Sequence, residues 1–169
     1  MVLYGYALYA AGRVDESAGV YNAALKVDPE LPEALVGRAE VDVRAEKPDS
    51  ALQFIRRAES SLKTLTRPPA FRARMLTLKG HAFVQRAQSG DFDQATQALF
   101  EAVALPGVSS EAFFWLGEAQ AGARRPRVAT AAYQRYMALD PQGIFVARAK
   151  RALETRPAPQ PEPQLKPQP

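Results

Sequence analysis

The sequence contains no cysteine and a single histidine, His81, among its 169 residues. Without cysteine there is no disulfide framework, no thiolate metal site and no cysteine nucleophile. The glycine-rich phosphate and dinucleotide motifs and the serine nucleophile motif are also missing, and one histidine supports little metal or base chemistry. We therefore expect a non-catalytic protein with no cofactor and no metal site.

Long apolar runs are missing as well. No segment approaches the roughly 18 consecutive apolar residues of a membrane-spanning helix. The N-terminal segment MVLYGYALYAAGR lacks the basic start of a signal peptide. We expect a soluble chain without membrane insertion, located by default in the cytoplasm. Its 47% apolar and 24% charged residues suit one sizeable globular domain.

What the sequence does contain is an internal repeat. Gly5 and Ala39 are 34 positions apart, as are Tyr21 and Ile55. The same spacing recurs later in the chain, at Ala95 and Ala129, Leu99 and Tyr133, and Val103 and Met137. Self-similarity at a fixed period indicates stacked structural units, so small and large apolar residues occupy equivalent positions in each unit. The spacing predicts two pairs of such units.

Turn signals divide each unit into two helices. Gly12 and Gly90 each end a first apolar-periodic segment, and an acidic residue that can start a helix follows. Pro48 and Pro126 lie near the first turn of a second helix, where the missing N–H group is harmless. Each unit is therefore predicted to be an αα-hairpin.

This pattern resembles the tetratricopeptide repeat family. The family positions are occupied most completely in residues 112–141, by Phe113, Leu116-Gly117, Ala129, Tyr133 and Leu139-Asp140-Pro141. The resemblance implies an all-α, right-handed superhelix of about four hairpins, at about 1–31, 32–66, 68–106 and 109–141. An amphipathic segment at 142–154 is predicted to cap the stack and complete a domain of residues 1–154. The proline-rich segment 155–169 is predicted to be a disordered tail or linker.

Two departures from the pattern lead to further expectations. The first repeat lacks its N-terminal turn, as expected for a piece of a longer chain. The second and third repeats are separated by 44 rather than 34 positions, because the second helix of repeat two keeps its helical phase through Leu62 and Leu65. We expect that helix to continue through Leu65, and we expect it to pack on a lengthened first helix of repeat three.

The resemblance implies a concave groove lined mainly by the first helices. The predicted partner-binding residues are Tyr6, Tyr9, Val36, Glu40, Val43, Arg44, His81, Phe114 and Glu118. For His81 both a groove role and a structural role remain open. The Lys and Asn of the family's chaperone clamp are missing, because those positions hold Val2 and Tyr6 in the first repeat. An extended or helical apolar segment of another protein fits this lining better.

Two other functions remain open. Residues 56–86 contain eight basic residues and one acidic residue, and residues 124–156 are also basic, whereas residues 28–49 are acidic. The basic stretches would suit a polyanion or nucleic acid, so nucleic-acid binding is the first alternative. Self-association of the truncated first hairpin, giving a homo-oligomer, is the second.

Overall fold

The computed structural model describes residues 1–154, and this part of the chain contains nine helices and no strand. The helices are α1 (Val2–Ala10), α2 (Val14–Val27), α3 (Pro32–Arg44), α4 (Pro48–Ser61), α5 (Pro69–Arg86), α6 (Asp91–Val103), α7 (Glu111–Gly122), α8 (Pro126–Leu139) and α9 (Val146–Glu154). The prediction of an all-α helical repeat is confirmed. The tail predicted for residues 155–169 lies outside the described residues.

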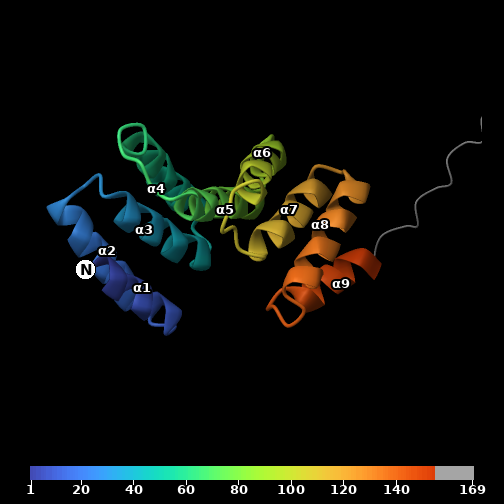
Figure 1. Cartoon of the computed structure of the whole chain (residues 1–169), viewed down its shortest axis with the longest axis horizontal. Helices are drawn as coiled ribbons and strands as arrows, with labels where there is room; N and C mark the ends of the chain where they lie inside the picture. The colour runs from blue at the N-terminus through green and yellow to red at the C-terminus, as the bar shows by residue number, and fades with distance from the viewer. Residues whose placement is uncertain (155–169) are drawn as a thin grey trace, which may run out of the picture.

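Consecutive helices pack in pairs and the pairs form an arch (Figure 1). The main contacts join α1 to α2, α3 to α4, α5 to α6 and α7 to α8, while α9 packs on α8. The first helices of successive hairpins also contact one another, from α1 to α3, α3 to α5 and α5 to α7. We call the surface formed by α1, α3, α5 and α7 the inner face. None of the helices within residues 1–154 is long and apolar enough to span a membrane.

Glycines let the paired helices approach each other. A Cβ atom added to Gly5 would lie 2.7 Å from the ring of Tyr21, and one added to Gly117 would lie 2.6 Å from the ring of Tyr133. Both tyrosines are only 1% exposed. Because these contacts leave no room for a side chain at the two glycines, the small and large residues detected in the repeat are packing partners.

Three of the turns inside hairpins share one backbone geometry. A residue with positive φ follows the first helix in each, and these residues are Gly12 (φ 78°), Glu46 (φ 54°) and Arg124 (φ 59°). The next backbone N–H group donates to a carbonyl five residues earlier in all three turns, at distances of 2.8–2.9 Å. This arrangement satisfies carbonyl groups that the end of a helix leaves without partners.

The junction between repeats two and three differs from the prediction. The prediction that α4 continues through Leu65 is wrong: α4 ends at Ser61, and Leu65 is 42% exposed. The Thr64 hydroxyl donates to the Ser61 carbonyl in the turn that follows. Residues before a proline avoid helical geometry, so the Pro68-Pro69 pair favours this early end. The predicted lengthening of α5 is confirmed, because α5 has 18 residues.

The last helix begins later than predicted. It starts at Val146 rather than at residue 142, because residues 140–145 form turns. These turns bring the Phe145 ring parallel to the Phe114 ring, with 4.3 Å between centroids and 6° between planes. The backbone N–H group of Phe145 donates to the Tyr136 hydroxyl at 3.0 Å. The capping helix therefore begins directly after a residue whose ring and backbone both contact the preceding hairpin.

Candidate functional site

A pocket of about 550 Å³ opens at the edge of the inner face. The turn between α3 and α4, the C-terminal part of α5, α7 and α9 all contribute to it. Its lining consists of Glu46, Pro48, Asp49, Val84, Gln85, Arg86, Gln88, Trp115 and Arg148. Apolar surface from Val84 and the edge of the nearly buried Trp115 thus lies beside charged groups of both signs.

Two arginines hold fixed positions around this pocket. Arg86 donates to both carboxylate oxygens of Asp91, at 2.8 and 2.7 Å, and also to Asp49 at 3.2 Å. The hydrogen bonds from Arg86 keep the pKa of Asp91 below its usual range. Arg148 pairs with Glu118, and its guanidinium carbon lies 5.8 Å from the centroid of the Trp115 ring. Arg148 thus stacks a cation on an aromatic side chain of the pocket.

His81 contributes packing rather than charge. Its ring stacks on Trp115 with a centroid separation of 3.3 Å and an interplanar angle of 19°. Burial, together with the positive charge of Arg148, lowers the pKa of His81 to about 3. The imidazole is therefore neutral near pH 7. Of the two roles left open by the sequence, the stacking supports the structural one.

The α1 end of the inner face combines tyrosines with arginines. Tyr6 is 50% exposed, and the guanidinium of Arg74 lies 5.2 Å from its ring centroid. Arg44 lies 5.3 Å from the centroid of Tyr9. Burial and then the charge of Glu40 raise the pKa of Tyr9. Two aromatic faces at this end therefore already carry stacked cations.

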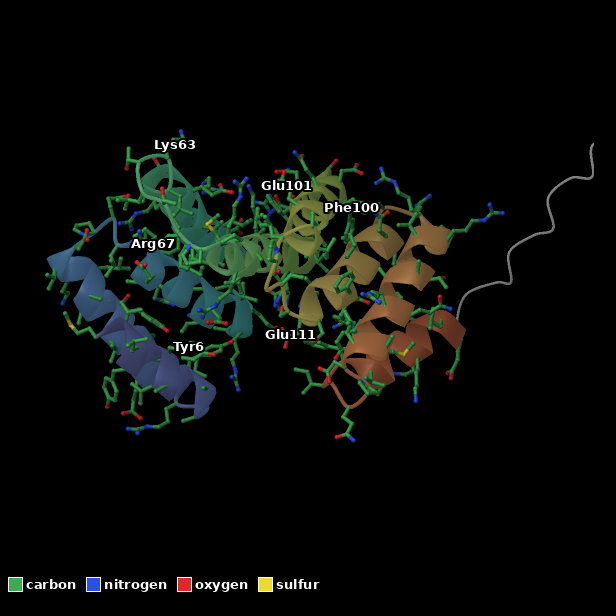
Figure 2. The ribbon with its side chains drawn as sticks, in the orientation of Figure 1. Tyr6, Lys63, Arg67, Phe100, Glu101 and Glu111 are labelled. Carbon is green, nitrogen blue, oxygen red and sulfur yellow. The ribbon has the colours of Figure 1, made fainter. Side chains whose placement is uncertain are left out.

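Glu111 faces these groups from the other side of the arch. Figure 2 shows Tyr6 projecting from α1 and Glu111 from α7 toward the hollow between the two halves. Glu111 forms no ion pair within residues 1–154. The surrounding protein removes part of its water, and Glu40 and Asp140 add negative charge, so its pKa is raised. A cation placed here would be stabilised by the carboxylate.

The structure separates the predicted groove residues into two groups. Val36, Val43 and Phe114 are 0%, 3% and 0% exposed. All three belong to the main hydrophobic core, because the neighbouring hairpins and the Phe145 ring cover them. The prediction that these three contact a partner is therefore wrong.

The other predicted residues keep at least part of their surface. Tyr6 and Arg44 are exposed, and the partly exposed residues are Tyr9, Glu40, His81 and Glu118. Glu118 accepts hydrogen bonds from the Tyr133 hydroxyl and from Arg148. The sequence reasoning missed Arg148, which lies in the predicted capping segment and lines the pocket. The Trp115 ring also borders the pocket, although it is 5% exposed and belongs to the main hydrophobic core.

Most of the basic side chains in residues 56–86 are already neutralised. Six of the eight form ion pairs, which are Arg57–Glu30, Arg67–Glu33, Arg72–Glu101, Arg74–Glu40, Lys79–Glu59 and Arg86–Asp49. Arg56 and Lys63 form none within residues 1–154. The acidic segment 28–49 supplies four of the six partners, so the two charged segments neutralise each other. This pairing leaves little free positive charge for a polyanion on residues 56–86, which are one of the two basic stretches.

Comparison with protein families matches residues 4–64 and 85–144 to the tetratricopeptide repeat family. The chain belongs to this family. Its repeats generally form non-catalytic scaffolds that bind other proteins, and this chain has that scaffold architecture. A comparison with curated protein sequences finds no significant match.

Solved structures of several other proteins share this fold. A crystal structure of MamA is 21% identical, with a TM-score of 0.64 over 88% of this chain and 80% of that one. The Cut9–Hcn1 hetero-tetramer of the APC/C is 17% identical, with a TM-score of 0.78 over 90% of this chain and 29% of that one. PilF of Pseudomonas aeruginosa is 19% identical, with a TM-score of 0.64 over 90% and 72%. At these identities the likeness concerns the fold alone.

Proposed function

We propose that this protein is an adaptor that binds a segment of another protein along its inner face. The observation that carries the proposal is the pocket lined by Val84, Arg148 and the edge of the 5% exposed Trp115, since arginine beside apolar surface is a typical anchor of protein recognition. An apolar side chain of the partner would cover Val84 and that edge of the Trp115 ring. The fixed position of Arg148 limits the entropy lost on binding.

The charges of the inner face favour a basic residue in the same partner segment. Glu111 forms no ion pair within residues 1–154, and partial burial and then the charges of Glu40 and Asp140 raise its pKa. A lysine or arginine of the partner would relieve this repulsion. The partner chemistry we propose is therefore an extended segment with an apolar anchor and a basic side chain.

Paired variants in affinity capture test this proposal. The chain is immobilised, nuclease-treated extract is passed over it, and the retained proteins are quantified by mass spectrometry. Arg148→Ala removes the cation at the pocket, and Lys150→Ala on the same helix is its control. Tyr6→Ala removes an aromatic group from the inner face, and Tyr4→Ala on the same helix is its control.

We expect Arg148→Ala and Tyr6→Ala to lose the same retained protein at least tenfold, and the two controls to keep it. Peptides covering that protein should then locate the bound segment, and Glu111→Gln should weaken its binding most at low salt. Equal retention by all four variants would contradict the proposal. Partners that are retained from untreated extract but not from nuclease-treated extract would instead support nucleic-acid binding.

A further inference from the structure

The outer side of the arch carries a second pocket, of about 460 Å³. Its floor is α5, one wall is the end of α4 with the turn that follows, and the other wall is α6. Figure 2 shows Lys63 and Glu101 on the two walls, on the side of the arch away from Tyr6 and Glu111. We call this cavity the outer pocket, and its lining includes Leu62, Lys63, Arg72, Met75, Leu76 and Glu101.

The outer pocket lies where the chain departs from the repeat pattern. The second and third repeats are separated by 44 rather than 34 positions, and the match to the family leaves out residues 65–84. Four lining residues, Arg72, Met75, Leu76 and Lys79, belong to this unmatched segment. The pocket is therefore built in part from residues that the family pattern does not describe, and a groove on the inner face does not account for it.

Internal contacts fix both walls of the outer pocket. Lys79 of α5 donates to Glu59 of α4 at 2.7 Å, which joins the floor to the first wall. On the other side, the Leu99 side chain of α6 fills the space beside Gly80 of α5, so that a Cβ atom added to this glycine would lie 2.3 Å from it. A ligand would therefore enter a pocket that is already formed, and binding would order few groups.

The floor of the outer pocket is apolar. Met75, Leu76 and Ala98 are 3%, 4% and 4% exposed, so only their edges border the pocket. Leu62 is half-buried and adds more accessible apolar surface on the wall. The half-buried Lys79 adds its hydrocarbon chain. An apolar side chain of a ligand would be favoured here, since it would remove this surface from water.

The charged groups of the outer pocket are not all neutralised. Lys79 and Glu59 form a close pair, but the nitrogen of Arg72 and the oxygen of Glu101 are 3.6 Å apart, which is longer than a hydrogen bond. Arg72 and Glu101 are also 61% and 47% exposed, so water screens their attraction. Lys63 is exposed and forms no ion pair within residues 1–154. Lys63 and Arg72 thus form a cationic side of the rim, opposite the wall that carries Glu101.

We propose that the outer pocket binds an acidic segment of a partner protein. A carboxylate of that segment would lie between Lys63 and Arg72, where the Arg72 guanidinium can form the two parallel hydrogen bonds that Glu101 does not take up. An adjacent apolar side chain would cover Leu62 and the edges of the floor. The exposed amide of Gln97 on α6 would pair with the backbone of the same segment.

Charge and apolar surface together select this occupant. Glu59 and Glu101 in the lining would repel the closely spaced phosphates of a nucleic acid, and a phosphate backbone offers no apolar side chain for the floor. A basic segment would leave Lys63 and Arg72 without an anion. The site is separate from the inner face, which favours a basic segment, so one molecule would hold two segments of opposite charge on its two sides.

NMR mapping of backbone amide shifts with three capped synthetic peptides tests the proposal. The first peptide contains leucine and glutamate, the second replaces each glutamate by lysine, and the third replaces each leucine by serine. The leucine and glutamate peptide should shift the amides near Leu62, Arg72 and Gln97 and should leave those near Tyr6 unchanged. The other two peptides should bind the outer pocket at least tenfold more weakly.

Charge-reversal variants identify the groups that bind the carboxylate. The double variant Lys63→Glu and Arg72→Glu should weaken binding of the leucine and glutamate peptide at least tenfold, and it should strengthen binding of the lysine peptide at the same pocket. The double variant Arg56→Glu and Lys150→Glu is the matched control, because it changes the charge equally at two exposed cations outside the outer pocket. Circular dichroism establishes that each variant keeps its fold.

The result does not depend on the inner face. Tyr6→Ala and Arg148→Ala should bind the leucine and glutamate peptide as the wild type does, even where the function proposed for the inner face fails its own test. An absence of shifts at the outer pocket, or an equal loss of binding in the two double variants, would overturn the proposal. A single-stranded oligonucleotide that displaces the peptide and binds the pocket more tightly would also overturn it, because the ligand would then be a nucleic acid.

Discussion

Two junctions of the arch are held together by different chemistry. Between repeats two and three, ion pairs connect α3 with α5 and the segment before it, and Glu33–Arg67 and Glu40–Arg74 are both 34 residues apart. Between α7, α8 and α9 the contacts are aromatic, with Phe114 surrounded by Trp115, Tyr133, Tyr136 and Phe145.

The two kinds of contact differ in strength, so they indicate which part of the arch is rigid. Ion pairs that stay partly exposed contribute little free energy and are screened by salt, whereas buried aromatic packing is lost only by leaving a cavity. We therefore expect the C-terminal junction to be the stable part of the molecule. The junction between α3 and α5, where Val36 and Val43 are also buried, should depend more strongly on salt concentration.

The largest effect should come from the centre of the aromatic junction. Phe114→Ala should reduce the free energy of unfolding by about 4 kcal/mol, because it leaves a cavity at a fully buried site. Urea denaturation measures the loss. Phe100→Ala is the control, since Phe100 is 48% exposed on α6 and its loss should cost about 1 kcal/mol or less. Similar losses in the two variants would contradict the comparison.

A smaller effect should appear where the two regions meet, at the His81–Trp115 stack. The pKa of His81 is about 3 in the folded protein and about 6.5 in the unfolded chain, so between these values only the unfolded chain binds the proton. Its contribution to stability is therefore present above pH 6.5 and is lost as the pH falls toward 3. We expect a loss of about 3 kcal/mol by pH 4.

The variant His81→Gln provides the measurement for this effect. It has no titrating group at position 81, so the difference in unfolding free energy between wild type and variant should change steadily from pH 7 to pH 4. Carboxylate titration affects both proteins and cancels in the difference. A constant difference would show that folding does not shift the pKa of His81.

The smallest effect should come from the ion pairs. A double variant Arg67→Gln and Arg74→Gln should lose about 1 kcal/mol at low salt and less at about 1 M salt, because screening weakens the wild-type pairs. The double variant Arg56→Gln and Lys63→Gln removes the same charge from residues without ion pairs. It should have little effect at either salt concentration. Equal losses would mean that net charge, not pairing, sets the stability.

The sequence predicted the hairpins because their packing is local. Within one hairpin the contacting residues are 16 positions apart, as in Gly5 with Tyr21 and Gly117 with Tyr133. This fixed spacing is visible in the sequence and identifies the contacting pair. The end of α4 was not predictable in the same way. The phase of Leu62 and Leu65 suits a helix, and phase alone does not report the prolines that interrupt it.

The site was harder to predict because it depends on contacts between hairpins. Val36 and Val43 face inward on their own helix, but the neighbouring hairpins cover them. This coverage depends on how the hairpins stack, and the sequence of a single repeat does not determine the stacking. Phe114 is covered by Phe145, which reaches it only because a turn precedes α9. Arg148 enters the pocket from the capping helix, where the repeat pattern has no position for it.

The shared turn geometry inside the hairpins has a consequence for the evolution of the chain. Gly12 fills the positive-φ position without strain, whereas Glu46 and Arg124 hold a conformation that costs a residue with a side chain about 1 kcal/mol. Two of the three turns therefore keep a residue that the backbone disfavours. Replacing Glu46 or Arg124 by glycine should therefore stabilise the folded protein.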